Sequence, residues 1–253
     1  MNLFEWMLKL LKEYGTNFLA GTGYTLIMSI VGTLVGFLIG LAIAVVRTIP
    51  QKKSGTVGFW GFKVINFILN AYIEIIRGTP MMVQALIIHY SLFAPNHVPA
   101  LVSALIIISV NTGAYMAEIV RGGIISVDKG QFEGAHSIGM THMQTMVHVI
   151  LPQAIRNIMP SIGNEFVVNI KDSSVLSVIS ITELLFYSKM AGGTYAKYVP
   201  AYIICAVIYF VLTFTVTRIL RAIEKKMNGS ENYTICGSQS DSKAEVHVKG
   251  AAK

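Results

Sequence analysis

The chain has 253 residues, of which 53% are apolar and 13% are charged, against about 25% charged in typical soluble domains. This composition excludes an ordinary soluble domain and predicts an all-α polytopic membrane protein. The net charge of +7 does not indicate nucleic-acid binding, because the basic residues lie between apolar runs and not on one polar face. The two cysteines imply no disulfide framework.

Residues 1–20 are amphipathic rather than uniformly apolar. A signal peptide would need an unbroken apolar core, so we expect an interfacial helix that lies flat on the membrane. Six apolar side chains fall on one face of this helix: Leu3, Met7, Leu10, Leu11, Tyr14 and Phe18.

Residues 24–46 form the first apolar run long enough to cross a bilayer. Gly32, Gly36 and Gly40 recur in it at intervals of four residues. Small residues at that interval let two helices approach closely. The neighbouring helix could belong to another subunit or to the same chain, and the sequence favours neither alternative.

Four further spans follow a short basic loop at 47–61. The first, residues 62–93, is interpreted as one crossing kinked at Pro80, with three short passes as the alternative. The other three lie at 98–120, 160–181 and 200–220. We therefore expect a membrane domain over 21–222. Residues 223–253 are polar and without period, which predicts a disordered cytoplasmic tail.

The stretch 128–152 lies between two spans and predicts two short, capped helices. Asp128 with Gln131, and Thr141 with Gln144, stand in capping-box positions. Gly139 lies between the two helices and can adopt the left-handed conformation that ends a helix.

The second of these helices has an apolar stripe that needs a cover: Met143, Met146, Val147 and Ile150. A loop outside the bilayer can find a cover only on protein or on lipid headgroups. We therefore favour a loop that docks on a partner over a solvated hairpin that only links two spans. We call residues 128–152 the docking loop.

The basic residues predict an orientation if the docking loop is cytoplasmic. Five spans then place the N-terminus outside and the C-terminus inside. Only four basic residues ahead of the tail would be outside: Lys9, Lys12, Lys189 and Lys197. The inside would hold Arg47, Lys52, Lys53, Lys63, Arg121, Lys129, Arg156, Arg218, Arg221, Lys225 and Lys226. This asymmetry agrees with the positive-inside rule.

Three polar residues fall at matching depths in the predicted spans. At 1.5 Å per residue, Glu74, Asn111 and Glu165 lie roughly 13–18 Å from the cytoplasmic side, near the middle of a core about 30 Å thick. A charge there costs about 2.5–3.5 kcal/mol unless it is paired or hydrated. The shared depth predicts a solute site. Structural pairing of Glu74 with Arg77, or of the glutamates with Lys171, has equal weight.

Sequence signatures of catalysis are missing. The chain has no G-x-x-x-x-G-K-[ST] phosphate loop, so we expect it to bind no ATP itself. It has no nucleophile elbow and no paired catalytic carboxylates. His142 and His148 are six residues apart, which is not the spacing at which two helical residues share a metal. We therefore expect a chain that is not an enzyme and holds no metal.

Part of the docking loop resembles the EAA loop of ABC-importer permeases. That motif reads E-A-A, three residues, G, nine residues, I, one residue and L-P, and this chain has Gly134 in place of Ala and Val149 in place of Ile. In that family the loop is a coupling helix that sits in a groove of the ATP-hydrolysing subunit. The resemblance implies this role for Glu133, Gly134, Ala135, Gly139, Leu151 and Pro152.

Three further stretches are similar to polar amino-acid permeases. Residues 77–84 resemble the family's RGTP-x-x-VQ stretch, 113–131 the run before its EAA loop, and 171–179 its KDTSL-x-SVI stretch. Asp128 replaces a usual proline and Val175 a common leucine. The resemblance covers about residues 20–222. It implies a type I ABC-importer transmembrane domain, with about five transmembrane helices, in a bacterial inner membrane.

The resemblance also implies the partners. These are a dimer of ABC ATPase subunits that bind ATP and magnesium, a second permease subunit of the same or a related chain, and an extracytoplasmic protein that delivers a polar amino acid. The alternative is a non-transporting receptor or scaffold subunit with the same fold, which would need no polar residues in mid-membrane. An ion channel is less favoured, because we see no regular polar stripe.

A translocated amino acid presents an ammonium, a carboxylate and a side chain, each of which needs a partner. Glu74 and Glu165 could bind the ammonium or a cationic side chain of the substrate, and the two asparagines could hydrogen-bond to either end of it. The arginine, or the broken backbone at 78–80, could bind the substrate carboxylate. This favours cationic or neutral polar substrates. Lys171 and Asp172 are assigned to an ion pair. The candidate substrate residues are Glu74, Arg77, Thr79, Asn111, Asn164 and Glu165.

Overall fold

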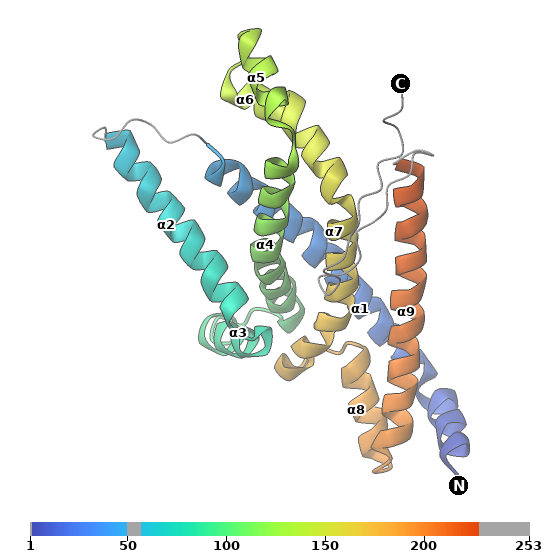
Figure 1. Ribbon diagram of the computed structural model, residues 1–253. Coiled ribbons are helices and arrows are strands. Elements are labelled where there is room, and N and C mark those ends of the chain that lie inside the picture. Colours follow the sequence, from blue (N-terminus) through green and yellow to red (C-terminus); the bar gives the residue numbers. More distant parts are fainter. Residues whose placement is uncertain (1, 50–56, 228–253) are drawn as a thin grey trace.

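The structure is a computed structural model that describes residues 2–49 and 57–227, and within these ranges it is helical with no strand (Figure 1). Short π-helices occupy His89–Phe93 and Met146–Ile150, and a 3₁₀ helix occupies Ser173–Ile179. The all-α prediction is confirmed. The α-helices are α1 (Leu3–Arg47), α2 (Val57–Gly78), α3 (Met81–Ile88), α4 (Ala100–Ser126), α5 (Lys129–Ser137), α6 (His142–Thr145), α7 (Leu151–Asp172), α8 (Leu184–Thr194) and α9 (Tyr198–Met227).

Two sequence predictions fall outside the described residues. Lys52 and Lys53, which were counted for the orientation, are among them. So is most of the tail that was predicted to be disordered, residues 228–253.

The described helices contain four or five membrane spans. Helices α1, α2, α4 and α9 are each long and apolar enough to cross a bilayer. A fifth span is formed if His142–Ile179 and Leu184–Thr194, which meet at an angle of 55°, count as one broken span. The prediction of about five transmembrane helices is confirmed.

Helix α1 packs along α4, and its three spaced glycines face that helix. A Cβ atom on Gly36 would lie 2.7 Å from the Thr112 side chain. One on Gly40 would lie 2.5 Å from Met116. The glycines therefore permit a close contact within this chain, which decides between the two alternatives that the sequence left open.

The N-terminal residues do not form a separate helix, contrary to the expectation for 1–20. Helix α1 runs without a break from Leu3 to Arg47. Leu10 and Phe18 are buried in a cluster with residues of α8 and α9, among them Leu184 and Ala201. The chain's own helices thus cover part of the amphipathic stripe, whereas Leu3 and Leu11 remain 50% and 43% exposed. Periodicity identified the apolar face correctly but could not reveal what covers it.

The crossing predicted over 62–93 also differs from the structure. Helix α2 ends at Gly78, and α3 begins at Met81 after Pro80, which caps it. Figure 1 shows α3 turned away from the direction of α2. Because α2 alone is long enough to span, the single kinked crossing is replaced by a spanning helix and a short apolar helix, Met81–Phe93.

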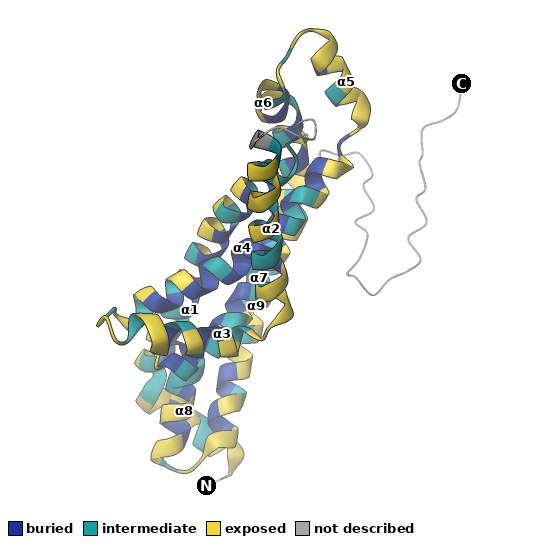
Figure 2. Ribbon diagram, turned by 90° about the vertical axis from the view of Figure 1, so that its left-hand side faces the viewer, coloured by how far each residue is buried: buried dark blue, intermediate teal, exposed yellow. Residues whose placement is uncertain are grey.

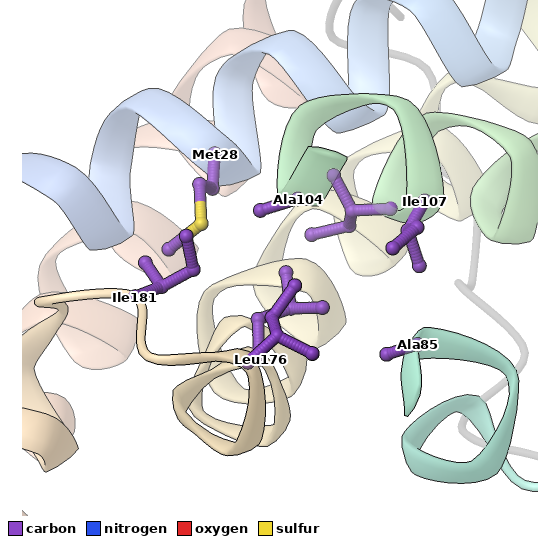
Figure 3. Close-up of a cluster of buried hydrophobic side chains, with 8 residues drawn as sticks. Met28, Ala85, Ala104, Ile107, Leu176 and Ile181 are labelled. Carbon is purple, nitrogen blue, oxygen red and sulfur yellow. The ribbon is translucent and has the colours of Figure 1, made fainter. Parts of the chain in front are cut away.

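One apolar cluster holds α3 and the 3₁₀ segment against α1 and α4 (Figure 3). Met28, Ala85, Ile107 and Leu176 meet in it from these four segments. It therefore holds the segment after the break against three other parts of the bundle.

Burial is uneven among the spans (Figure 2). In the most apolar window of α4, 61% of the residues are buried, against 22% for α9 and 11% for α2. Helix α4 is thus the centre of the bundle, whereas α2 and α9 are its least covered spans.

The two ends of the bundle carry different elements (Figure 1). The N-terminus, α3 and α8 lie at one end. The docking loop and the C-terminal end of α9 lie at the other, which we call the loop end.

Candidate functional site

A charged group lies between α2 and α7, close to the middle of α4. The guanidinium of Arg77, in the last turn of α2, lies 5.4 Å from the centroid of the Tyr115 ring. Arg77 also interacts electrostatically with Glu165 of α7. Asp172, two helical turns beyond Glu165, acts on the same carboxylate. Three helices thus bring one cation, two carboxylates and an aromatic ring together.

The break after α2 is tied to α4 by one glutamine. The side-chain nitrogen of Gln84 donates to the carbonyls of Ile76 and Thr79, at 2.8 and 2.9 Å, and to Thr79 Oγ1 at 2.8 Å. Its oxygen accepts from the Asn111 amide at 3.0 Å. Proline has no N–H, so Pro80 cannot continue the ladder of α2. Gln84 satisfies the carbonyls left at that end and connects them to Asn111.

A second polar link joins α1, α4 and α7. The hydroxyl of Thr112 donates to Asn169 Oδ1 at 3.0 Å, and Asn169 Nδ2 donates to Thr33 Oγ1 at 2.8 Å. All three side chains are buried. Hydrogen bonds of this kind stabilise helix contacts within a bilayer, where no water competes.

The six predicted substrate residues are distributed over three groups. Arg77 and Glu165 interact electrostatically without forming an ion pair. Thr79 and Asn111 are joined through Gln84. Glu74 and Asn164 make no hydrogen bond or ion pair within the described residues, and both are exposed, as are Arg77 and Thr79.

The alternative pairings considered for these charges are not among the ion pairs of residues 2–49 and 57–227. Neither Glu74 with Arg77, nor a glutamate with Lys171, lies within ion-pair distance there. The expected ion pair of Lys171 with Asp172 is likewise missing, although the two interact electrostatically.

The ion pairs that the structure does show lie nearer the loop end, and sequence reasoning missed them. Glu118 of α4 accepts from Arg47, the last residue of α1, and from Arg121 Nη2 at 2.9 Å. Glu118 and Arg121 are three residues apart, a spacing at which helical side chains meet. Arg47 precedes Glu118 by 71 residues, so no short-range sequence pattern could have predicted that the two residues pair.

The docking loop has the caps predicted from its sequence, with one difference. Thr141 and Gln144 form a complete capping box, and Gly139 has φ +85°. The Asp128 carboxylate accepts from Gly130 N at 2.7 Å, which caps α5, but Gln131 does not return the bond as the expected box requires.

Only part of the loop's apolar surface is covered by the chain. Met146 and Ile150 are fully buried, in a cluster with the end of α4. Ile138, Met143 and Val147 remain 78%, 54% and 47% exposed, and Figure 2 shows the loop as a largely exposed end of the molecule.

Some residues matched to the EAA motif are exposed and others are buried. Glu133 and Gly134 are exposed, whereas Ala135 is buried against the chain. Leu151 and Pro152 form the first turn of α7, where a proline needs no N–H partner.

Two histidines of the loop influence each other. Burial first, and then the proximity of His136, lower the pKa of His142. His142 is therefore held neutral over a wider range of pH than a free histidine. No group of three or more potential metal ligands occurs among the described residues.

Comparisons with known proteins agree on one family. The profile of the "binding-protein-dependent transport system inner membrane component" family matches residues 54–229. The glutamine transport system permease protein GlnP of Escherichia coli K12 is 33% identical over 210 residues, 82% of this chain and 91% of the relative. The L-cystine transport system permease protein TcyB of Bacillus subtilis is 34% identical over 198 residues, 78% of this chain and 82% of the relative.

A solved structure is similar over nearly the whole fold. It is described as an amino acid ABC transporter with histidines, and its chain superposes with a TM-score of 0.73 at 36% identity. The match covers 89% of this chain and 99% of the other.

Proposed function

We infer the function from the premise that this chain belongs to the family of binding-protein-dependent transport system inner membrane components. It is a transmembrane permease subunit of an ATP-driven amino-acid importer. The alternative, a non-transporting receptor or scaffold, is not favoured, because the relatives are named as permeases of amino-acid transport systems.

The observation that carries the proposal is the group formed by Arg77, Tyr115 and Glu165. Charged side chains at membrane depth are costly, and they mark substrate or ion pathways when they face a bundle interior or a hydrated cavity. Here they come from the last turn of a spanning helix and from the two helices beside it. We assign substrate contact to this group, together with Thr79 and Asn111.

The substrate that fits this group best is a cationic or neutral polar amino acid. The carboxylates of Glu165 and Asp172 interact electrostatically on α7. Together they would attract an ammonium or a cationic side chain. Arg77 is the matching partner for the substrate carboxylate, since a guanidinium binds a carboxylate through two parallel hydrogen bonds. An acidic substrate would instead face two like charges. Glu74 and Asn164, exposed beside this group, are assigned no direct contact.

The coupling role belongs to the docking loop. Its exposed Ile138, Met143 and Val147 form an apolar surface outside the spans, which suits a groove on an ATPase subunit. We propose that each permease contacts one subunit of an ATPase dimer there, and that the ATPases alone bind ATP and magnesium. The complex would move substrate by alternating access.

The orientation follows from the same assignment. With the ATPases in the cytoplasm, the docking loop and the end of α9 are cytoplasmic and the N-terminus is outside. The basic residues of the loop end, such as Arg47, Arg121 and Arg221, support this through the positive-inside rule. The opposite end, with α3 and α8, would receive a solute-binding protein.

Uptake by the complete complex tests the proposal. Permease, ATPase and binding protein are reconstituted in vesicles, and labelled amino-acid uptake is measured with single unlabelled competitors. We expect ATP-dependent uptake that cationic or neutral polar amino acids inhibit and acidic ones do not. Permease alone should neither transport nor hydrolyse ATP. ATP hydrolysis by the chain alone, or a complex that assembles without transporting any amino acid, would refute the assignment.

A further inference from the structure

Helix α1 is much longer than a membrane is thick. Its 45 residues extend about 67 Å at 1.5 Å per residue, whereas the hydrocarbon core of a bilayer measures about 30 Å. Two arrangements accommodate the excess length. Either the first third of α1 projects upright from the membrane, or the whole helix crosses the membrane obliquely. Contacts with α9 distinguish between the two.

The start of α1 lies beside the start of α9. The ring of Trp6 lies 5.5 Å from that of Tyr195, which stands three residues ahead of α9. The Lys9 ammonium lies 4.1 Å from the centroid of the same tyrosine ring. Trp6 and Lys9 are therefore close to the level of Tyr198, the first residue of α9.

The following turns of α1 keep this alignment. A Cβ atom on Gly21 would lie 2.9 Å from the backbone of Leu184 in α8. The residue before Leu184 is Glu183, which accepts from the Tyr209 hydroxyl of α9 at 2.8 Å. Gly21 is thus close to the level of Tyr209, and the first twenty residues of α1 run beside residues 198–209 of α9.

That part of α9 must lie in the membrane. Residues 198–217 contain no charged residue. Val199, Tyr202 and Val207 are 64%, 40% and 52% exposed, and an exposed apolar surface of this kind needs an apolar surrounding. An upright α1 that left the membrane near residue 24 would carry these side chains into water. Tyr198 therefore marks the membrane surface opposite the loop end, and the start of α1 lies at that surface.

At the other surface, α1 and α9 again share a level. Arg47 pairs with Glu118 of α4. Five residues nearer the loop end, a Cβ atom on Gly123 would lie 2.4 Å from an α7 side chain that precedes Gly163 by five residues. The Cβ position of Gly163 is in turn 3.2 Å from Leu220 of α9. Because α4 and α7 run in opposite directions (Figure 1), the two steps cancel and Arg47 lies at the level of Leu220.

The two levels fix the inclination of α1. Between them α9 rises about 33 Å, from Tyr198 to Leu220, whereas α1 rises about 57 Å, from Lys9 to Arg47. Since both helices cover the same depth, an upright α9 implies a tilt of about 55° for α1, and a tilted α9 implies a larger one. Membrane helices are tilted by about 20° on average, within a range of about 0–40°. Figure 1 shows α1 running diagonally across α4, α7 and α9.

An exposed apolar stripe follows α1 from its start into the span. Leu8, Leu19 and Ile30 are 52%, 74% and 46% exposed. They are spaced by eleven residues, about three helical turns, and so lie on one side of the helix. Ile30 belongs to the apolar run 24–46, where an exposed side chain contacts lipid. The stripe at the start of α1 is thus continuous with a lipid-facing surface.

We propose that residues 3–19 of α1 are embedded obliquely in the outer leaflet and bind its phospholipids. Acyl chains contact the stripe at Leu8 and Leu19, while the exposed Lys12 faces the headgroup phosphates, whose charge it complements. Amphipathic helices with basic residues on one side and large apolar ones on the other bind membrane surfaces in this way. The embedding does not depend on transport. Only the name of the leaflet rests on the proposed function, which places this end of the bundle outside.

Fluorescence quenching in phospholipid vesicles tests the contact. A fluorophore is attached to Leu8→Cys in the full chain, with Cys205 and Cys236 changed to alanine. The matched control is Glu13→Cys, an exposed position about 140° around the helix from Leu8. Phospholipids with brominated chains should quench the Leu8 label about threefold more than the Glu13 label, and aqueous iodide should do the reverse, as expected for two sides of a helix in the interface.

Two results of this experiment would overturn the proposal. Equal quenching of both labels by iodide would mean that the start of α1 stands in water. Protection of the Leu8 label from both quenchers would mean that protein covers the stripe, either a second copy or a solute-binding protein.

The tilt of α1 provides a second readout. Solid-state NMR of the chain in aligned bilayers, with isotope labels in residues 25–40, should give a tilt above about 40°, outside the usual range. Labels in α9 of the same sample check the alignment and should give a smaller tilt. A tilt of α1 below about 40° would contradict the oblique crossing. Neither experiment uses the ATPase or the substrate, so transport can fail while the embedding stands, and the reverse.

Discussion

The docking loop and the group formed by Arg77, Tyr115 and Glu165 are built in opposite ways. Each cap of the loop is made within three residues of chain: Asp128 with Gly130, and Thr141 with Gln144. The three residues of this group come from three helices. A change in the loop should therefore act locally and disturb coupling. A change among the residues that link the helices should act through the bundle or on the substrate.

The largest effect is expected where the interior links hold the bundle together. Asn169→Leu removes the hydrogen-bond partner of Thr33 and Thr112 and leaves both buried hydroxyls without that bond. Each unsatisfied buried group costs about 1–3 kcal/mol, so we expect the purified permease to lose about 2–6 kcal/mol of stability in thermal unfolding. Asn164→Leu, the same change at an exposed site on the same helix, is the control. Equal stability of the two variants would mean that the link contributes nothing.

A change in the loop should leave the bundle folded. Gly139 has φ +85°, a conformation that costs other residues roughly 1–2 kcal/mol, so Gly139→Val should distort the turn between α5 and α6. We expect normal thermal unfolding of the spans but a reduced yield of ATPase in co-purification.

Gly134→Ala is the matched control for that substitution. Nothing lies within 4 Å of its Cβ position, and its φ is not positive. It should keep the ATPase yield at the wild-type level. If both substitutions behave alike, the left-handed turn is not what positions the loop.

Reversing a charge on the exposed face of the loop should act on assembly alone. Glu133 is exposed on α5, so Glu133→Lys removes no packing within the chain. We expect the permease to insert normally and to bind the ATPase about tenfold more weakly, the loss of roughly one charge-assisted contact. Normal transport with full ATPase binding would exclude Glu133 from the contact.

The smallest effect is expected from a single cap. Thr141→Ala removes the hydroxyl that accepts from Gln144 N at 3.3 Å. Loss of such a cap costs about 1 kcal/mol. Hydrogen exchange in the docking loop should accelerate about fivefold, while exchange in α4 stays unchanged. Faster exchange in both would show that loop and bundle unfold together.

The features that could be predicted from the sequence are the local ones, and those that could not are contacts between distant helices. Gly139 and the Thr141 box were predicted because a cap is a relation between near neighbours. Arg77 and Glu165 were singled out by depth and charge, but Tyr115 and Gln84 were not, because the break at Pro80 turns α3 back onto α4. The N-terminal helix was misjudged for a similar reason: Leu10 and Phe18 mark an apolar face whose cover, α8 and α9, lies far along the chain.

The most direct test of the account compares uptake and ATP hydrolysis in one reconstituted complex that carries Glu165→Gln. The substitution keeps the size of the side chain and removes the negative charge that we propose contacts the substrate. We expect uptake to fall about 10- to 100-fold, as for the loss of one hydrogen bond to a charged group, while ATPase binding and ATP hydrolysis are retained. Full uptake by this variant, or loss of assembly together with uptake, would contradict the assignment of Glu165 to the substrate.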